Sequence, residues 1–495
     1  MKLKSILAKP FAGIVHRKIQ KEMFTAVADQ EKILQQLLKK GAKSSFGQAH
    51  GLEKAYDYQS FKQSVPIRDY EGFRGYIEEI KSGKSNVLWP GKPIYLAKTS
   101  GTTSGAKYIP ITADSIPNHI NTARNALLTY IATTGKADFA SGNMIFLSGS
   151  PTLDRIGGIP TGRLSGIVNH HIPAYLKKNQ LPSYETNCIE DWEEKLDRIV
   201  AETWQKDMTL ISGIPPWMQM YFDRLMEKTG KKVGEIFPNF QVLVHGGVNF
   251  SPYKAKLLES IGHAVDTIET FPASEGFFAF QDTRDQEGLL LNTNSGIFFE
   301  FIPAGEIFNE NPTRLSLKDV KLGENYALII NNNAGLWGYN IGDTVKFVDK
   351  EKSEIIITGR TKHFLSLVGE HLSVDNMNKA VQMASQKFNI SIPEFTVAGI
   401  PVDNFFGHHW FVACNDDVNE KKLCSFIDQC LNELNDDYAV ERKSALKEVR
   451  LTVLKEDDFM NFMLSKGKLG GQHKFPRVLK GSMLKDWYQF LEKNK

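Results

Sequence analysis

The first part of the chain carries apolar residues at the spacing of an α-helix. Residues 21–42 carry apolar residues at helical spacing, among them Phe24, Val27, Ile33, Leu34, Leu37 and Leu38. Gly41 follows them and is a plausible stop, since glycine is frequent just beyond the last turn of a helix. The pattern predicts a helical region over about the first 90 residues.

In the middle of the chain, short apolar runs alternate with amphipathic segments. The runs at 144–149, 207–213 and 240–247 each end in glycine, and the segments 191–205 and 215–230 between them have a helical pattern. Alternation of strand, turn and helix is typical of an α/β domain with a largely parallel sheet. In such sheets ligands bind at the carboxyl ends of the strands, so we expect a site near these glycine-rich turns.

The last third of the sequence predicts a second unit. Successive strands are expected within residues 326–358, and a smaller α+β pattern follows, with strands at 394–400, 408–415 and 448–454 and a helix at 419–437. A change of pattern at such a point indicates a domain boundary. We therefore predict a large domain of residues 1–358, a small mobile domain of residues 359–495, and a hinge near 358–366.

The composition is that of an ordinary globular protein. Hydrophobic residues make up 41% and charged residues 24%, close to the globular average. The formal net charge of +3 gives no overall attraction to nucleic acid or to acidic membranes, so an anion must be bound by a local site. No stretch approaches the roughly 18 uninterrupted apolar residues of a membrane span. The four cysteines have no zinc-binding spacing and are expected to be reduced.

The N-terminus contains two early lysines and a weakly apolar stretch. Lys9 and Pro10 interrupt this stretch, and His16, Arg17 and Lys18 follow, so the continuous apolar core of a signal peptide is missing. We expect an amphipathic first helix, residence in the cytoplasm and no membrane partner.

The segment from Lys98 to Lys107 is the most informative stretch for chemistry. Five hydroxyl residues and two glycines fall within positions 99–105. Glycines let successive backbone N–H groups point at one anion, and hydroxyls add short donors, so the segment predicts a loop that binds a polyphosphate. Its spacing does not fit the Walker A pattern. A flexible linker is the alternative, but the apolar strand at 93–97 and the ordered pattern at 109–112 argue against it.

This loop resembles the first motif of the adenylate-forming superfamily of acyl ligases and luciferases. Residues 269–276, Glu-Thr-Phe-Pro-Ala-Ser-Glu-Gly, resemble its second motif, and residues 339–343, Tyr-Asn-Ile-Gly-Asp, resemble its third. Residues 471–477, Gly-Gln-His-Lys-Phe-Pro-Arg, resemble a C-terminal lysine motif. Over nearly its whole length the chain is similar to the auxin-responsive Gretchen Hagen acyl-acid amido synthetase family, in its bacterial branch. The resemblance implies a large adenylate-forming N-terminal α/β domain with mixed or parallel sheets and a smaller α+β C-terminal domain.

The resemblance also implies roles for individual residues in binding MgATP. Glu275 would help to coordinate Mg²⁺, Asp343 would bind the ribose hydroxyls, and Lys474 would reach the α-phosphate and the incoming carboxylate as a catalytic residue beside Glu275. Arg360 would lie in the hinge motif, because two half-reactions need two arrangements of the small domain. The complete set of expected nucleotide-binding residues is Thr99, Ser100, Gly101, Thr102, Thr103, Thr270, Phe271, Pro272, Ala273, Ser274, Glu275, Asp343, Arg360 and Lys474.

Each of these residues also has a purely structural interpretation. Glu275 could be a surface or helix-capping glutamate, Asp343 could serve a turn, and Lys474 could be a solvated lysine in a basic tail. Two positions depart from the family pattern: Phe271 stands where tyrosine is usual, and Asn340 where arginine is frequent. These departures put fine nucleotide contacts and the substrate in doubt.

Further candidates are weaker. Arg124, within a helix expected at 117–132, could pair with a substrate carboxylate, although a surface arginine is more common. The pairs His170–His171 and His408–His409 suggest a metal, but adjacent residues on a strand point to opposite faces and make a poor chelate. No GxSxG motif is present, which lowers the case for a hydrolase.

The sequence therefore predicts a ligase with ATP and Mg²⁺ as cofactors and a small carboxylic acid and an amino acid as partners, without nucleic acid. It would form an acyl-adenylate and pass the acyl group to an amine. The nearest alternative is an acyl-CoA ligase of the same superfamily, and a more distant one is a non-catalytic sensor of nucleotide or acyl groups. The acid, the amine and the oligomeric state are left open.

Overall fold

The computed structural model of the chain divides into two compact units. One comprises residues 1–248 and 257–357, and the other residues 249–256 and 358–495. The residues that the structure describes are 2–99, 107–172, 177–247, 250–284, 287–361, 365, 372–402, 405–435, 438–439, 442, 446–467 and 475–493. Within these ranges no helix is both long and apolar enough to cross a lipid bilayer.

Helices form the start of the larger unit, as predicted. Helix α1 (Lys2–Gly41) continues through Pro10, although proline removes a backbone donor there. It is followed by α2 (Ser45–Ala49), η1 (Leu52–Lys54), α3 (Tyr58–Ser64) and α4 (Tyr70–Lys81). The carboxylates of Asp57 and Asp69 cap α3 and α4 by accepting hydrogen bonds from backbone N–H groups of the first turn.

A four-stranded sheet carries the predicted phosphate-binding segment. Its strand order is β2-β1-β5-β4, with β1 (Tyr95–Thr99), β2 (Lys107–Ile111), β4 (Asp154–Ile156) and β5 (Ile159–Gly162). β1 and β2 are antiparallel, and Thr99 pairs with Lys107. The rest of the predicted phosphate-binding segment, residues 100–106, lies outside the described residues.

The second sheet of this unit has eleven strands in the order β12-β13-β14-β15-β11-β10-β9-β8-β7-β3-β6. Its strands are β3 (Asn143–Phe146), β6 (Gln180–Leu181), β7 (Met208–Gly213), β8 (Val242–Gly246), β9 (Asp266–Ala273), β10 (Gly276–Phe280), β11 (Leu289–Leu291), β12 (Ile297–Pro303), β13 (Asn325–Asn332), β14 (Tyr339–Asp349) and β15 (Glu354–Arg360). Parallel pairing links β6, β3, β7, β8 and β9, whereas β9 meets β10 in an antiparallel hairpin. The sheet is thus mixed, and the expectation of a largely parallel sheet holds for one side of it.

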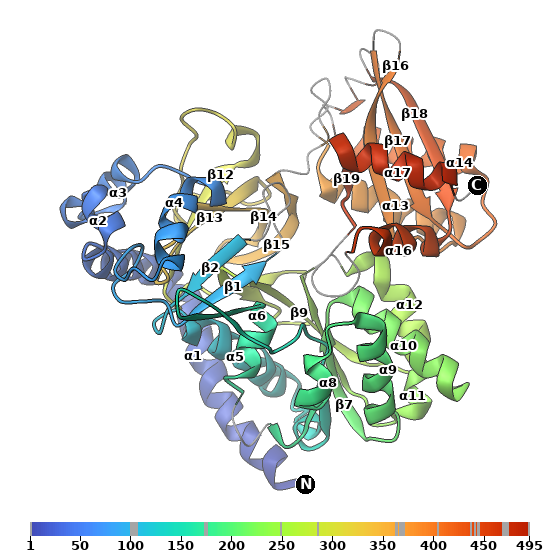
Figure 1. The fold of residues 1–495 in the computed structure, drawn as a ribbon, viewed down its shortest axis with the longest axis horizontal. Coiled ribbons are helices and arrows are strands. Elements are labelled where there is room, and N and C mark those ends of the chain that lie inside the picture. The colour runs from blue at the N-terminus through green and yellow to red at the C-terminus, as the bar shows by residue number, and fades with distance from the viewer. Residues whose placement is uncertain are drawn as a thin grey trace. The chain divides into compact units, whose positions relative to one another are not determined.

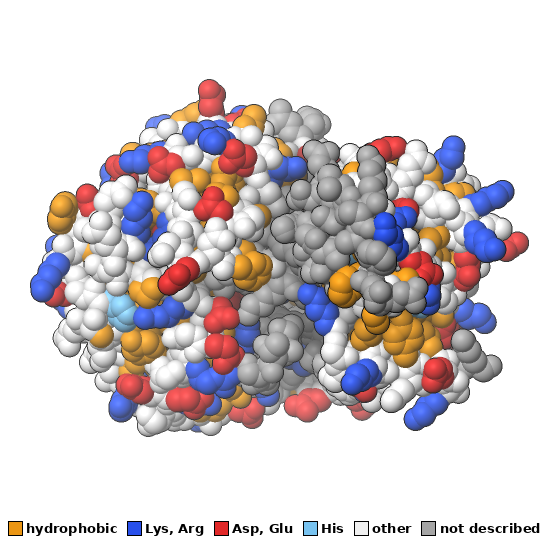
Figure 2. All heavy atoms as spheres, turned by 90° about the horizontal axis from the view of Figure 1, so that it is seen from above, with side chains coloured by type: hydrophobic (Ala, Val, Ile, Leu, Met, Phe, Trp, Pro, Cys, Tyr) orange, Lys and Arg blue, Asp and Glu red, His pale blue; other side chains and the backbone are white. Residues whose placement is uncertain are grey.

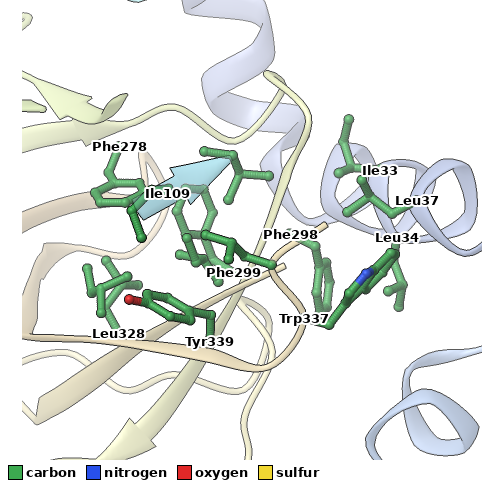
Figure 3. Close-up of a cluster of buried hydrophobic side chains, with 14 of the residues drawn as sticks. Ile33, Leu34, Leu37, Ile109, Phe278, Phe298, Phe299, Leu328, Trp337 and Tyr339 are labelled. Carbon is green, nitrogen blue, oxygen red and sulfur yellow. The ribbon is translucent and has the colours of Figure 1, made fainter. Parts of the chain in front are cut away.

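Further helices lie between these strands along the chain (Figure 1). They are α5 (Ile116–Thr134), α6 (Leu164–Asn169), α8 (Tyr184–Cys188), α9 (Trp192–Thr203), α10 (Pro215–Thr229), α11 (Val233–Ile236) and α12 (Ser251–Ile261), with short 3₁₀ turns η2 (Asp138–Ser141) and η3 (Ala304–Glu306). A continuous apolar core includes Ile33 from α1, Ile109 from β2, Phe278 from β10 and Tyr339 from β14. Figure 3 shows these side chains within one cluster. The core therefore joins three segments that carry predicted motifs.

The smaller unit is an α+β sandwich, in agreement with the sequence. Its sheet has the order β18-β17-β16-β19, from β16 (Phe395–Val402), β17 (Phe405–Ala413), β18 (Leu446–Leu454) and β19 (Val478–Leu479). Its helices are α13 (Val374–Phe388), α14 (Glu420–Leu434), α16 (Glu456–Ser465) and α17 (Gly481–Lys493). Trp410 packs in the cluster with α13 and α14, while its neighbour Phe411 packs with α16 and α17. Each face of the sheet thus buries a separate apolar cluster.

Candidate active site

The second sequence motif forms the hairpin at the seam between the parallel and antiparallel parts of the sheet. β9 ends at Ala273, which pairs with Gly276 at the start of β10. Ser274 and Glu275 are the two turn residues between them. The turn lies at the carboxyl end of β9, which is the edge at which open α/β sheets bind ligands.

Glu275 is held in place by two residues, one from β13 and one from β14. The hydroxyl of Tyr339, the first residue of β14, donates to Oε1 of Glu275 at 3.3 Å. The Asn332 amide donates to the backbone carbonyl of Glu275 at 2.8 Å. Tyr339 is 2% exposed, and burial together with the charge of Glu275 raises the pKa of its phenol well above the ordinary value. Tyr339 is thus a neutral donor that orients a half-buried carboxylate.

The third motif forms a strand with a bulge. The purely structural interpretation of Asp343, that it serves a turn, is the alternative to ribose binding. Ala327 pairs with Thr344, but Ile329 pairs with Asn340, so the register shifts across residues 341–343. Gly342 has a φ of 85°, which glycine adopts without steric cost. Its N–H is bonded to the side chain of Asn340 at 2.8 Å. Bulges redirect side chains, and this one sets the direction of the half-buried Asp343 next to Gly342.

Helix α4 connects the phosphate-loop hairpin to the third motif. The N–H of Tyr108 in β2 donates to the hydroxyl of Tyr70 at 2.9 Å, and the Lys107 ammonium lies 5.6 Å from the Tyr70 ring centre. One turn later the Phe73 ring packs edge-on against Tyr339 with centroids 5.6 Å apart. The base of the predicted phosphate loop and the residue that orients Glu275 are therefore held by the same helix.

The residues just before α4 pair directly with the backbone of the third motif. The Arg68 N–H donates to Gly338 O at 2.9 Å, and Asn340 N–H donates to Arg68 O at 2.8 Å. The Arg68 guanidinium also lies over the Phe46 ring, 5.4 Å from its centroid. The N-terminal helical region thus positions the start of β14.

β8 and β9 approach closely beside the hairpin. The Thr270 hydroxyl donates to His245 O at 2.9 Å. A Cβ added at Gly246 would stand 2.4 Å from Thr270 O, which is closer than atoms can approach. Glycine at this position therefore allows the ends of two parallel strands to lie together at the predicted nucleotide edge.

Helix α5 fixes the other side of the hairpin. The Asn118 side chain accepts from Phe277 N–H at 2.7 Å and donates to Phe277 O at 3.2 Å. Its neighbour His119 is 4% exposed, and burial lowers the pKa of this imidazole to about 4. The Asn118 side chain thus bonds to both the N–H and the C=O of Phe277, as the backbone of an adjacent strand would.

A buried lysine anchors the loop after β3. Lys195 on α9 is 2% exposed, and its ammonium donates to Ser148 O at 2.9 Å and Asn187 O at 2.8 Å. Burial lowers the pKa of Lys195 to about 8. Sequence reasoning missed Lys195, Asn118 and Asn332, because a helix pattern or strand end gives no indication of which polar residue bonds to a distant backbone.

The structure assigns part of the predicted residue set to particular strands and turns. Thr99 ends β1, residues 270–275 form the end of β9 and its turn, Asp343 lies in the β14 bulge and Arg360 ends β15. Ser100, Gly101, Thr102, Thr103 and Lys474 lie outside the described residues. Their predicted roles, like all the ligand contacts in the set, stay predictions.

The structure also describes the surroundings of two further candidates, Phe271 and Arg124. The Phe271 ring is 5% exposed and packs edge-on against Phe278 at a centroid distance of 5.2 Å, so it contributes to the core. Arg124 is exposed on α5, and its guanidinium donates to the adjacent Asn125. The pairing of Arg124 with a substrate carboxylate stays a prediction.

The histidine pairs have separate structural partners. His170 and His171 follow α6, so the assumption that they lie on a strand is wrong; they contact Pro151 O and the Tyr95 hydroxyl. On β17, His409 bonds to Tyr488 and Thr452, while His408 lies near the Tyr438 ring. Within the described residues, no group of three or more His, Cys, Asp or Glu side chains is arranged to hold a metal ion.

Comparison with solved structures defines the class. The fold matches the GH3.15 acyl acid amido synthetase with a TM-score of 0.77 at 18% identity, covering 96% of this chain and 94% of that one. It also matches 2-hydroxyisobutyryl-CoA ligase in the postadenylation state with a TM-score of 0.61 at 11% identity, covering 93% and 91%. The fold is that of the adenylate-forming ligases, and the predicted fold class is confirmed.

The sequence comparisons identify the family. The GH3 family N-terminal domain matches residues 15–185, the GH3 family central domain residues 290–356 and the GH3 family C-terminal domain residues 375–482. The jasmonoyl–L-amino acid synthetase JAR4 of Nicotiana attenuata is 24% identical, over 91% of this chain and 90% of that protein. The indole-3-acetic acid-amido synthetase GH3.15 of Arabidopsis thaliana is 22% identical, over 90% and 89%. The chain belongs to the GH3 family, as the motifs predicted.

Proposed function

We propose that this chain is an acyl acid amido synthetase that uses ATP to join a small carboxylic acid to an amino acid. The observation that carries the proposal is the support of Glu275 at the hairpin turn by Tyr339 and Asn332. The names of its relatives, which are amino acid-conjugating synthetases, support the same reaction. The acid and the amino acid of those relatives are not carried over.

The reaction has two balanced steps. A carboxylate oxygen attacks the α-phosphorus of ATP, the bond to the β-phosphate breaks, and pyrophosphate leaves. The amine of the amino acid then attacks the acyl carbon, the bond to AMP breaks, and the amine loses a proton. Both reactants of the first step are anionic, so catalysis depends on positioning and on neutralising charge.

The residues of the hairpin fit a magnesium ion and a nucleotide. Mg²⁺ prefers oxygen ligands and few protein carboxylates. Glu275 offers a half-buried carboxylate, and its hydrogen-bond partner Tyr339 is a neutral phenol. A bound Mg²⁺ would supply charge neutralisation for the phosphates. Thr99 and the loop residues Ser100, Gly101, Thr102 and Thr103 would donate to the phosphates, residues 270–274 would border the nucleotide, and Asp343 would accept from the ribose.

The C-terminal unit would supply Lys474 to the α-phosphate and the carboxylate. Its movement about a hinge near 358–366, where Arg360 lies, would serve the two half-reactions. This role rests on the family resemblance. If Lys474→Ala formed the adenylate at the normal rate, the assignment of Lys474 would be wrong.

The decisive experiment measures pyrophosphate release with MgATP and a panel of aryl and alkyl acids. The proposal expects release that depends on one acid, and AMP release that an amino acid accelerates. Acceleration by coenzyme A in place of any amino acid would favour the second candidate, an acyl-CoA ligase, which the similarity in fold to 2-hydroxyisobutyryl-CoA ligase keeps open. ATP binding without turnover of any acid would favour a sensor.

Two finer points belong to the same proposal. Membership of the bacterial branch of the family rests on the resemblance of the motifs alone, and the relatives named above are plant proteins at 24% and 22% identity. Residence in the cytoplasm, which the sequence predicted, is also part of the proposal.

A further inference from the structure

The outward face of helix α1 is the most apolar exposed surface among the described residues. Six of the thirteen exposed large hydrophobic side chains of that part of the chain belong to α1. Leu7, Phe11 and Ile14 are 62%, 48% and 59% exposed. Their spacing of four and three positions places them on one side of a helix.

The opposite side of the same helix is fixed to the protein. Ala12, Ile19 and Met23 are 0%, 8% and 8% exposed and pack in the core with residues of α5 such as Ala126 and Tyr130. The helix cannot rotate its apolar residues inward without giving up this packing. In Figure 1, α1 runs beside α5 along the outside of the N-terminal unit.

The N-terminal half of α1 has an excess of positive charge. The first 21 residues contain six lysines and arginines and no aspartate or glutamate, and the first acidic residue, Glu22, pairs with Lys18 at 3.5 Å. Lys9, Arg17, Lys18 and Lys21 are exposed and flank the apolar residues. Elsewhere, on the face that Figure 2 shows, basic and acidic side chains are interspersed. The surface near the N-terminus is therefore strongly basic, although the net charge of the whole chain is small.

We propose that this outer face, formed by Ile6, Leu7, Phe11 and Ile14 with Lys9, Arg17, Lys18 and Lys21, binds the surface of an anionic lipid bilayer. An amphipathic helix with aromatic and aliphatic residues on one side and lysines beside them lies in the plane of a membrane interface. Long lysine side chains reach the headgroups while apolar residues enter the acyl boundary. The sequence predicted no membrane partner because it showed no span; the surface is visible only once the inner face of α1 is assigned to the core.

The positive charge of this surface argues against a second copy of the chain as the partner that covers it. A two-fold interface places identical surfaces against each other, which would bring two sets of the four exposed cations Lys9, Arg17, Lys18 and Lys21 together. Headgroups of phosphatidylserine carry the opposite charge and attract each basic residue near the surface. The proposal is independent of the proposed enzymatic function.

The test is co-sedimentation of the full chain with vesicles of phosphatidylcholine containing about 30% phosphatidylserine, compared with pure phosphatidylcholine, in about 0.1 M salt. We expect the unmodified chain to bind the anionic vesicles at least tenfold more strongly than the neutral ones. The double variant Lys9→Gln/Lys21→Gln should bind the anionic vesicles about 25-fold more weakly than the unmodified chain. The double variant Leu7→Ser/Phe11→Ser should lose binding. Thermal unfolding establishes that each variant is folded.

Matched controls make the result specific. Lys39→Gln/Lys43→Gln changes the net charge equally at the other end of α1, and Phe308→Ser removes an apolar side chain that is 72% exposed outside it. Neither control should alter binding. Equal binding to neutral and anionic vesicles, or equal losses in the controls, would overturn the proposal. So would a dimer, measured by sedimentation velocity, that Phe11→Ser converts to a monomer.

Discussion

The link between Tyr339 and Glu275 leads to a quantitative prediction. Tyr339→Phe removes one hydroxyl and keeps the ring, whose packing against Phe73 and Ile109 is part of the core. A hydrogen bond to a charged group contributes about 1.5–3 kcal/mol. The O···O distance of 3.3 Å exceeds the usual 2.7–2.8 Å, so we expect the lower end, about 1.5 kcal/mol, or about tenfold in an equilibrium or rate.

The assay is pyrophosphate release at increasing Mg²⁺ with ATP and acid in excess. We expect Tyr339→Phe to need about tenfold more Mg²⁺ for half-maximal rate, because the unanchored carboxylate must be ordered when the ion binds. Tyr326→Phe is the matched control, since Tyr326 is also fully buried in the same sheet but its hydroxyl bonds to Glu324. If both variants had the same Mg²⁺ dependence, the positioning role of Tyr339 would be refuted.

Three further predictions concern the support of the hairpin. Asn118→Ala should destabilise the larger unit by about 2 kcal/mol or more, because the N–H and C=O of Phe277 lose their partner; calorimetry would measure the lowered Tm, and an unchanged Tm would contradict the assigned bonds. Gly246→Ala should impair pyrophosphate release, since its Cβ would stand 2.4 Å from Thr270 O and push the strand ends apart; activity equal to wild type would show that this edge is not used. Burial lowers the pKa of His119 from 6.5 to about 4, so the unfolded state binds more protons between these values and stability falls as pH falls from 6.5 toward 4. His119→Gln should lose less Tm than wild type between pH 7 and pH 5, and parallel losses would argue against a neutral buried imidazole.

Much of the fold could be predicted because it is encoded locally. The apolar runs that end in Gly213 and Gly246 became adjacent parallel strands, and α1 ends at Gly41 as its spacing indicated. The β9–β10 hairpin was not predicted, because Pro272 makes residues 269–276 look unlike a strand. Hydrophobic periodicity indicates which face is buried, but it does not indicate which strands will be neighbours.

The motifs of the candidate site could be recognised in the sequence, but the residues that hold them in place could not. Glu275 and Asp343 were identified by resemblance to family patterns, which are short and continuous in sequence. Tyr70, Asn118 and Asn332 act through hydrogen bonds to segments far away in the chain. Such bonds depend on tertiary placement, and polar residues on a helix or at a strand end are usually solvated.

The two-residue turn between Ala273 and Gly276 also limits how the chain can change in length. In a hairpin the turn sets the register, and a shift by one residue exchanges the two faces of a strand. Inserting or deleting one residue there would either carry Glu275 away from Tyr339 or turn the buried side chains of β10 outward. Related sequences that keep the reaction should therefore accumulate insertions in other loops, such as 304–324, and align without gaps across this turn.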